Sequence, residues 1–593
     1  MRQWESTLFK PLIAGLLLAG SLLFLYSDPQ AQGTQVDAKV IGAPLITQPG
    51  VAGGELVFGS NNVPGSLNPI FGGNPITAVS DAGLIELNPV TLAYEPAVAS
   101  AYTVSADNTT IQVTLRSGIK WSDGEPVTAD DVVFTFVTLL QNSGLLQNLA
   151  NFGNQLTLPT YTITSPDAQH LTFNFPNKDA SQMVAALTLP LFPKHIFPNV
   201  DAPNFFQQWG INTPANQVVG LGAFRVVSFT SNGDNNNPVI NGAVLERNPN
   251  YWKKDPNGTT LPYANKLTFN FLPQAADLNT LLGNGQLDLL GGAGSDADVA
   301  LAAVPGVTMV IGDPFVTADS LIFNEDAADA NLKSLFRDDR FRQAIAHTLD
   351  RTKLTNQLTD NAKFLAPREN AAYFKSPFFN DAATTKYVYD LNAAKQLLDQ
   401  IGLKDTNGDG VREFSDGKPV KFDFNTNNNN SVRVAAGEEL TSIWKSLGLD
   451  VNYLVESFAT LQGRFDFNNR KANFDIQLIA FGIGINTIQD VNYLNCQYAS
   501  NGFCHVQRFS DPAGATDRQK RIDDIFTKLS GPALSSADQT ALENELQTLI
   551  SQDLGQIPLW TSRMATAIRS GVHNAESVGV FGVPHSLEYI WKS

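Results

Sequence analysis

The chain has 593 residues, 43% of them hydrophobic and 16% charged, and 57 acidic against 40 basic residues give it a net charge of −17. Its length corresponds to roughly three to five domains, and its composition excludes disorder along the whole chain. The acidic balance disfavours binding to nucleic acid or to anionic lipid. Two cysteines and six histidines are too few for a disulfide-stapled scaffold or a multi-zinc module.

The first 33 residues have the organisation of an export signal. Arg2 and Lys10 precede an apolar run, Pro11–Tyr26, which small and turn-forming residues follow. The run is shorter than the ~20 residues of a full membrane span, and an uncleaved anchor is the alternative. We expect residues 1–33 to be a signal peptide or an N-terminal anchor and residues 34–52 a linker. The protein is then exported to the periplasm or to the outer face of the cytoplasmic membrane.

Strand patterns dominate the N-terminal half of the remaining chain. We expect a buried strand over 54–59, an alternating strand over 110–116 and, after a turn over 122–126, a helix capped by Thr128. The same rules predict a hairpin of strands 222–229 and 243–247 with a loop over 232–238, a strand over 266–272 and a helix over 276–282.

The C-terminal half is richer in helix. Apolar spacing predicts helices over 340–354, 394–401, 438–447 and 524–554, and strands over 450–454, 474–481 and 558–560. Mixed segments without a regular βαβ alternation or an internal repeat favour an α/β or α+β body of several domains and exclude a solenoid.

Several blocks of sequence stand in an order that points to one family. The longest is Leu92–Val132, which contains Trp121-Ser122-Asp123-Gly124, and it is followed by the blocks 219–224, 246–252, 285–288, 339–346 and 557–560. Together they resemble the family 5 extracellular solute-binding proteins, the peptide- and nickel-type receptors of ABC importers. Residue by residue, the Trp121 block is most simply a turn before a helix, and Arg342 most simply a helix-surface or ion-pair residue.

The resemblance implies an α/β, two-lobed periplasmic-binding-protein-like fold (type II, class C-like) that closes about a hinge, with an extra domain inserted in lobe I. It assigns 53–75, 216–325 and 556–593 to lobe I, 76–215 to the extra domain and 326–555 to lobe II. The implied function is that of a monomeric receptor without a cofactor, which binds a solute between its lobes and delivers it to ABC permease and ATPase subunits. A peptide is the first choice of ligand, and a sugar or another small solute is the alternative.

The resemblance also indicates ligand contacts. In the peptide-binding branch, the strand 474–481 ends in an aromatic residue, and an aspartate three positions later pairs with the ammonium group of the peptide. Here that position is Gly484, and Asp490 can replace the aspartate only if the loop follows another path, which puts specificity for free di- or tripeptides in doubt. The predicted ligand-binding residues are Phe481, Gly482, Gly484, Asn486, Asp490 and Tyr493. Phe481 and Tyr493 would offer flat aromatic faces, and ordinary core packing explains them equally well.

Residues 405–416 have the spacing of a calcium loop, with oxygen donors at relative positions 1, 3, 5, 9 and 12, glycine at 6 and a backbone carbonyl at 7. The predicted ligands are Asp405, Asn407, Asp409, Val411, Glu413 and Asp416. Aspartate at the last position departs from the usual glutamate, and an Asx-rich turn without metal is the alternative. Any Ca²⁺ bound here would be structural.

Two further expectations concern chemistry. Export favours a disulfide between Cys496 and Cys504, with two reduced thiols as the alternative. An exported hydrolase is the main rival function, but the chain has no Gly-x-Ser-x-Gly, His-Glu-x-x-His or phosphate-loop motif, so we expect no enzyme. A chemoreceptor partner or an envelope chaperone on the same binding fold is a second rival.

Overall fold

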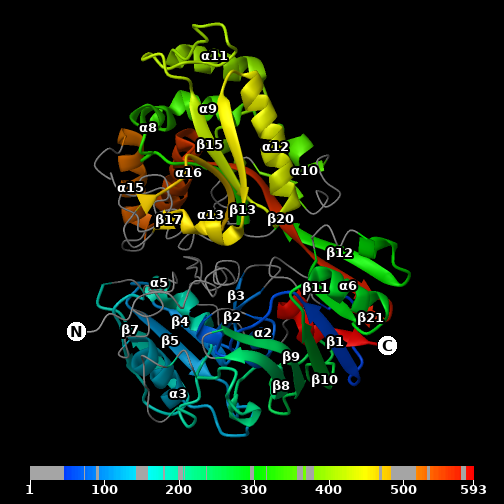
Figure 1. Ribbon diagram of the computed structural model, residues 1–593. Helices are drawn as coiled ribbons and strands as arrows, with labels where there is room; N and C mark the ends of the chain where they lie inside the picture. The colour runs from blue at the N-terminus through cyan, green and yellow to red at the C-terminus, as the bar shows by residue number, and fades with distance from the viewer. Residues whose placement is uncertain are drawn as a thin grey trace, which may run out of the picture. The chain divides into compact units, whose positions relative to one another are not determined.

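The computed structural model describes residues 46–71, 74–88, 93–141, 158–177, 180–197, 205, 208–234, 237–293, 300–314, 317–356, 365–368, 380–466, 471–482, 516–529, 534–575 and 583–593. The chain divides into two compact units, unit 1 (Met1–Asp313 and Met564–Ser593) and unit 2 (Pro314–Arg563). It therefore passes from one unit to the other twice. Figure 1 shows the elements of both units, each of which is described separately below.

The main sheet of unit 1 is built around β1 (Glu55–Ser60), which pairs in parallel with β10 (Lys266–Phe271) and β11 (Leu289–Ala293). The second half of β20 (Gln556–Arg569) is antiparallel to β11. Buried Leu56 and Phe58 on β1 alternate with less buried neighbours, as in a sheet with unequal faces. The strands predicted over 54–59 and 266–272 are thus confirmed.

The hairpin next to β10 is longer than predicted. It consists of β8 (Phe224–Asp234) and β9 (Asn237–Arg247), and its pairing continues through Asn232 opposite Val239 and Asp234 opposite Asn237. The loop expected over 232–238 is therefore wrong in its length. Cross-strand pairing holds these asparagines in extended backbone although they favour turns when considered alone.

A separate four-stranded antiparallel sheet in unit 1 has the order β4-β5-β7-β6. Its strands are β4 (Ala99–Val104), β5 (Thr110–Leu115), β6 (Thr162–Thr164) and β7 (His170–Asn174). After β5, a turn with Gly124 at φ 100° leads to α3 (Ala129–Val133), where the Asp131 carboxylate accepts from the Thr128 N–H at 2.9 Å. The predicted strand, turn and capped helix are confirmed.

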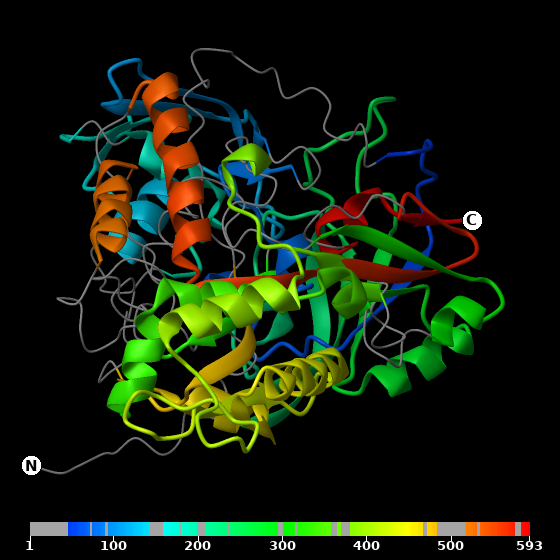
Figure 2. The ribbon, with the colours of Figure 1, turned by 90° about the horizontal axis from the view of Figure 1, so that it is seen from above.

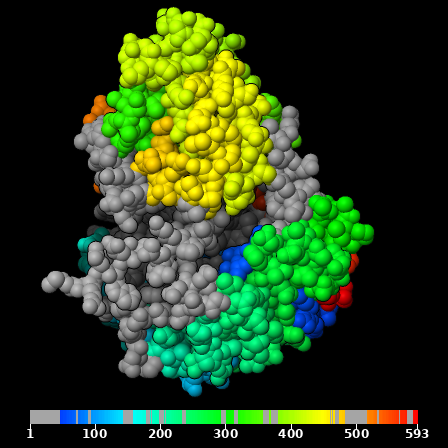
Figure 3. All heavy atoms as spheres, viewed as in Figure 1, coloured from blue at the N-terminus to red at the C-terminus, as the bar shows by residue number. Residues whose placement is uncertain are grey.

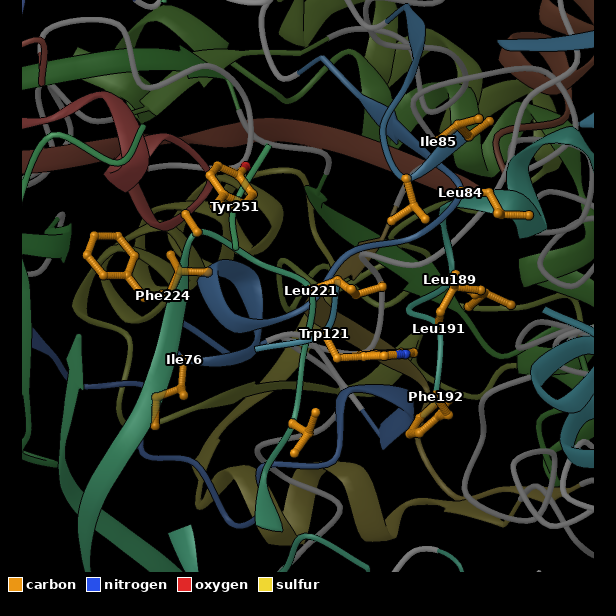
Figure 4. Packing of buried hydrophobic residues seen from close by; sticks show 14 of the residues in the cluster. Ile76, Leu84, Ile85, Trp121, Leu189, Leu191, Phe192, Leu221, Phe224 and Tyr251 are labelled. Carbon is orange, nitrogen blue, oxygen red and sulfur yellow. The ribbon is translucent and has the colours of Figure 1, made fainter. Parts of the chain in front are cut away.

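The remaining helices and strands of unit 1 are α2 (Thr77–Ser80), β2 (Ile85–Leu87), β3 (Tyr94–Pro96), α5 (Ala180–Met183), α6 (Ala275–Gly283), β12 (Val307–Pro314), β21 (Val572–His573) and β22 (Trp591–Lys592). One hydrophobic core joins much of the unit, and Figure 4 shows part of its packing. Trp121 of the family-like block is fully buried there, in the same cluster as Leu221 and Phe192, and Figure 4 labels all three. The block therefore serves packing and a turn, as its simplest interpretation predicts.

A buried ion cluster joins three distant segments of unit 1. The ammonium nitrogen of Lys253 lies 2.6 Å from a carboxylate oxygen of Glu86 and 3.0 Å from one of Glu588, and the Tyr251 hydroxyl donates to Glu588. Burial lowers the pKa of Lys253, but the carboxylates of Glu588 and Glu86 outweigh burial and hold this pKa well above its ordinary value. The cluster attaches the C-terminal tail to β2 and to the segment after β9.

Unit 2 contains the strand order β16-β15-β19-β13-β20, and β14 also pairs with β20. β15 is parallel to both β16 and β19, whereas β13 is antiparallel to β19 and to the first half of β20. The bounds are β13 (Thr317–Phe323), β14 (Leu365–Pro367), β15 (Lys421–Asn427), β16 (Asp450–Glu456) and β19 (Ile476–Gly482), with a short pair of β17 (Phe465–Asp466) and β18 (Lys471–Ala472). The strands predicted in this half are confirmed with shifted ends.

The helices of unit 2 are α8 (Ala330–Arg337), α9 (Asp339–Ala346), α10 (Arg351–Asn356), α11 (Leu391–Ile401), α12 (Ser431–Ser446), α13 (Phe458–Gly463), α15 (Asp517–Leu529) and α16 (Ser536–Asp553). Asp390 caps α11 by accepting from two backbone N–H groups, and Gly402 ends it at φ 93°. α15 and α16 pack side by side through an apolar face, as Figure 2 shows in orange.

The helix predicted over 340–354 is in fact two helices, α9 and α10. Between them, His347 Nδ1 hydrogen-bonds with the carbonyl of Val388 at 2.7 Å, and the His347 carbonyl accepts from the Asp390 N–H at 2.9 Å. These bonds to the segment before α11 stabilise a break that the apolar spacing does not reveal. The prediction over 524–554 likewise covers parts of α15 and α16 and not one helix.

Arg342 of the family-like block 339–346 is buried in unit 2. Its guanidinium donates to the Asp339 carboxylate at 2.6 Å and to the carbonyls of Asp553 and Phe336 at 2.8 and 2.5 Å. With 1% of its side chain exposed, it is a structural ion-pair residue and not a helix-surface one. It connects α9 to the end of α16.

The unit boundaries fall at 313/314 and 563/564, whereas the resemblance places them at 325/326 and 555/556. Unit 1 holds both the expected lobe I and the expected extra domain, and their separation from each other stays a prediction. The N-terminal segment 1–45 lies outside the described residues. Within the described ranges, no helix combines the length and the apolar character that a membrane span requires.

Candidate functional site

The carboxyl ends of three parallel strands of unit 2 meet at one edge, which we call the strand edge. Asn427, Glu456 and Gly482 are the last residues of β15, β16 and β19. From β15 the chain continues through α12 to β16 on one side, while β19 lies on the other side of β15. In open α/β sheets, such a reversal of strand order leaves room for a ligand at the carboxyl ends. The strand edge is therefore the candidate site in unit 2.

Two of the predicted ligand residues lie at the strand edge. Phe481 and Gly482 end β19, where Gly482 is opposite Thr317 of β13 and Phe481 is opposite Ala318. Gly484, Asn486, Asp490 and Tyr493 lie outside the described residues, as do Cys496 and Cys504. Their contacts, and the disulfide, stay predictions.

A buried ion pair supports the strand edge. Arg433, in the first turn of α12, donates through Nε to the Asp319 carboxylate of β13 at 2.5 Å and through Nη1 to Asn427 Oδ1 at 2.6 Å. The two charged side chains are only 10% and 4% exposed. The guanidinium is therefore neutralised from inside unit 2 and holds the end of β15, the start of α12 and β13 together.

A second pair lies at the end of β16. Arg464 donates to both Glu456 oxygens, at 2.8 and 2.6 Å, and Asn425 Nδ2 donates to the same carboxylate at 3.0 Å. The hydrogen bond from Arg464 is the main cause that lowers the pKa of Glu456. Like the charge of Arg433, both charges are balanced within the unit. The solvent-exposed residues nearby, Asn428 and Asn429 between β15 and α12 and Ser431 at the start of α12, are uncharged.

Sequence reasoning did not identify Asp319, Arg433, Glu456 or Arg464. Asp319 and Arg433 are far apart in the chain. Glu456 and Arg464 are closer, but the end of β16 and the helix α13 lie between them. One signal was present: the run Asn427–Asn430 follows a strand and precedes a helix, which is where polar site residues gather in α/β folds.

The loop 405–416 forms part of the surface of unit 2, yellow-green in Figure 3. Carboxylate oxygens of Asp405, Asp409 and Glu413 all lie within 4.8 Å of one another. Asn407 Nδ2 donates to Glu413 at 2.8 Å and to Asp409 at 3.1 Å. Three of the six predicted calcium ligands therefore converge through carboxylate oxygens, which fit the preference of Ca²⁺, whereas Asn407 faces them with its amide nitrogen.

Asp416, the predicted ligand at the last position, is turned to other partners. Its carboxylate accepts from Asn331 Nδ2 at 3.0 Å and lies 3.1 Å from the Lys418 ammonium group. Hydrogen bonds from Asn331 and then from Lys418 lower the pKa of Asp416 to about 2. The structure thus groups Asp405, Asp409 and Glu413 with Asn407 but does not bring Asp416 to them.

A match to a sequence model of a protein family shows which family this chain belongs to. The model of the bacterial extracellular solute-binding proteins, family 5 (middle region), matches residues 93–503, more than half of the chain. The chain belongs to this family. Its members are substrate-binding components of ABC importers, so the resemblance carried by the family-like blocks is confirmed, and so is the mixed α/β fold with two-lobed binding proteins as its structural neighbours.

Three similar proteins illustrate the range of the family. A probable ABC transporter-binding protein of Deinococcus radiodurans is 28% identical over 439 residues, 70% of this chain and 71% of its own length. A periplasmic alpha-galactoside-binding protein of Rhizobium meliloti is 27% identical over 405 residues, 63% of this chain and 56% of its own length. The oligopeptide-binding protein AppA of Bacillus subtilis, solved with a nonapeptide, matches at a TM-score of 0.66 with 21% identity, over 92% of this chain and all of that chain.

Proposed function

We propose that this family 5 protein is an exported receptor that binds peptides and delivers them to its ABC permease by hinge closure. The family membership supports the receptor role, and the AppA structure with its nonapeptide supports the choice of peptide. The strand edge supports an uncharged, hydrogen-bonding environment for part of the ligand, since its exposed loop is rich in amides. Binding without catalysis agrees with the family and with the absence of hydrolase motifs from the sequence.

A neutral oligosaccharide is the second candidate ligand. The alpha-galactoside-binding relative favours it, and so does Gly484, which removes the acid that a free peptide ammonium group needs. Amide side chains recognise sugar hydroxyls as readily as peptide groups. The two candidates therefore differ in ligand charge and not in the type of polar group at the strand edge.

The deciding experiment is native mass spectrometry of the protein purified from its own host. A retained mass that fragments into amino acids supports peptide binding, and one that fragments into hexoses replaces it with the sugar alternative. Titration calorimetry with the identified compound then checks that binding is stoichiometric. Release of altered products from that compound would contradict the proposal of a binding protein without enzymatic activity.

Partners and location follow from the same proposal. We expect export through the segment 1–33, a monomeric receptor, and copurification with two permease and two ATPase subunits in membranes that retain them. Closure needs a ligand that binds the closed state better than the open one. The two chain crossings at 313/314 and 563/564 are the proposed hinge, and a ligand-dependent fall in the radius of gyration by solution scattering tests it.

A further inference from the structure

Arg563 differs from eight other described arginines of unit 2, each of which lies near a carboxylate. It lies on β20, the long red strand of Figure 1, and is the last residue of unit 2. Its side chain is half-buried, and within the described ranges of the chain it has no ion pair. A half-buried guanidinium loses part of its hydration, so a missing carboxylate partner costs free energy unless a ligand supplies one.

The other arginines show that pairing is the rule in this unit. Of the ten other arginines that the structure describes in unit 2, eight lie within ion-pair distance of a carboxylate: Arg337, Arg340, Arg342, Arg412, Arg433, Arg464, Arg518 and Arg521. They include exposed and buried side chains. Carboxylates are therefore abundant in this acidic protein, and a shortage of them does not explain why Arg563 has no ion pair among the described residues.

The position of Arg563 relates it to the strand edge. β13 lies between β19 and β20, with Gly482 opposite Thr317 and Trp560 opposite Asp319. β20 is antiparallel to β13, so Arg563, three residues after Trp560, lies toward the Thr317 end of β13, where β19 also ends. β19 and β20 are two strand spacings apart, which is about 10 Å. An arginine side chain on β20 and one end of a bound peptide can together span this distance.

The charges at the strand edge leave Arg563 as the group suited to an anion. Arg433 is already neutralised by Asp319, and Arg464 by Glu456. The position of the expected ammonium-binding aspartate is Gly484 in the sequence. Of these three arginines, Arg563 is the one without a carboxylate partner among the described residues. This arrangement favours recognition of a carboxylate over recognition of an ammonium group.

We propose that the Arg563 guanidinium binds the C-terminal carboxylate of the peptide ligand, through charge-assisted hydrogen bonds, while position 484, a glycine, offers the amino terminus no carboxylate. This inference rests on the proposed peptide function. It makes Arg563 a specificity-determining residue: peptides with a free carboxyl end are preferred over amidated ones, and acetylation of the amino end is tolerated.

The test uses a pool of nonapeptides with randomised uncharged side chains, in four forms: free, N-acetylated, C-amidated and blocked at both ends. The full mature chain, the Arg563→Gln variant and an Arg225→Gln control are each equilibrated with the pools, and retained peptides are quantified by mass spectrometry. Arg225 is also a strand arginine, but it is exposed and paired with Glu246. Thermal unfolding of each variant checks that the fold is unchanged.

We expect the wild type and Arg225→Gln to bind free and N-acetylated peptides about tenfold to a hundredfold better than amidated ones, and Arg563→Gln to lose this preference. Equal binding of free and amidated peptides by the wild type overturns the inference but leaves the peptide receptor intact. An unchanged carboxylate preference in Arg563→Gln, or a fall in its unfolding temperature that accounts for lost binding of all four forms, also overturns the inference. Retention of no peptide form by the wild type overturns the peptide proposal and the inference with it.

Discussion

The strand edge and the loop 405–416 both gather carboxylates in unit 2, but they balance the charge differently. At the strand edge, Asp319 and Glu456 are each held by an arginine. In the loop, Asp405, Asp409 and Glu413 face one another, and their hydrogen bonds come from backbone N–H groups and from neutral side chains, such as those from Gly408, Gly410 and Thr406. Neutral donors do not cancel the repulsion among three carboxylates. Asp319 and Glu456 are thus neutralised without a ligand, whereas a bound cation would stabilise the three carboxylates of the loop.

The largest expected effect comes from opening the Asp319 pair. Arg433→Met leaves the Asp319 carboxylate buried without its cation, and we expect a loss of about 3–5 kcal/mol in the free energy of unfolding, measured by urea denaturation. The double variant Asp319→Asn/Arg433→Met should recover part of that loss because no unpaired charge remains. The control Arg225→Met opens the exposed pair with Glu246 and should cost less than about 1 kcal/mol. A similar cost for both single variants would remove the distinction between buried and exposed pairs.

The same reasoning predicts a smaller loss in unit 1. Lys253→Met leaves Glu86 and Glu588 without their common cation, but their side chains are 28% and 12% exposed and water relieves part of the penalty. We expect a loss of about 2–3 kcal/mol by urea denaturation. Lys194→Met is the matched control, because Lys194 pairs with Asp130 at 2.7 Å on the exposed surface. If the two lysine variants are equally stable, the buried cluster does not hold the C-terminal tail.

The contrast also explains what the sequence could predict. Patterns within one element were sufficient for β5, for the Thr128 cap and for the convergence of Asp405, Asp409 and Glu413, because the interacting residues are close in the chain. The Asp319 pair spans 114 positions and depends on which strands are neighbours, which spacing does not encode.

Even local patterns failed where distant partners intervened. The hydrogen bonds of His347 with Val388 and Asp390 interrupt a helical pattern. The hydrogen bond from Asn331 holds the Asp416 carboxylate apart from the other carboxylates of the loop. The family-like blocks gave the fold and the receptor role, but they are mostly structural: Trp121 and Arg342 are buried in packing and in an ion network. Ligand residues at the strand edge therefore needed the sheet order, not the motifs.

The stability of the protein should depend on pH through Asp553, a buried carboxyl group at the end of α16, and this dependence can be compared with that of an exposed carboxyl group. Burial raises the pKa of Asp553 to about 6, although Arg342 opposes the shift. Since the folded-state pKa lies above the ordinary value, this carboxyl group stabilises the fold fully below about pH 4 and loses that contribution as the pH rises through 6. The unfolding free energy of Asp553→Asn, relative to the wild type, should therefore rise by about 1–3 kcal/mol from pH 4 to pH 7. Asp517→Asn, at a fully exposed side chain, should show no such trend, and a parallel trend in both variants would contradict the assignment.

The smallest expected effect is the one that tests the loop 405–416. If the loop binds Ca²⁺ with the millimolar to submillimolar affinity typical of extracellular modules, about 5 mM CaCl₂ stabilises the wild type by about 1–2 kcal/mol over EGTA in urea denaturation. Glu413→Gln should abolish this gain because it removes the buried carboxylate of the cluster.

Asp416→Asn provides the sharper arm of this experiment, because it changes a carboxylate that Asn331 and Lys418 hold away from the cluster. The calcium-dependent gain should persist in it. A gain lost in both variants would mean that calcium binding turns Asp416 away from Asn331, so that the loop closes at its twelfth position. Equal stability of the wild type in calcium and in EGTA would instead establish the alternative, an Asx-rich turn in which backbone and side-chain N–H groups alone make three adjacent carboxylates tolerable at the surface.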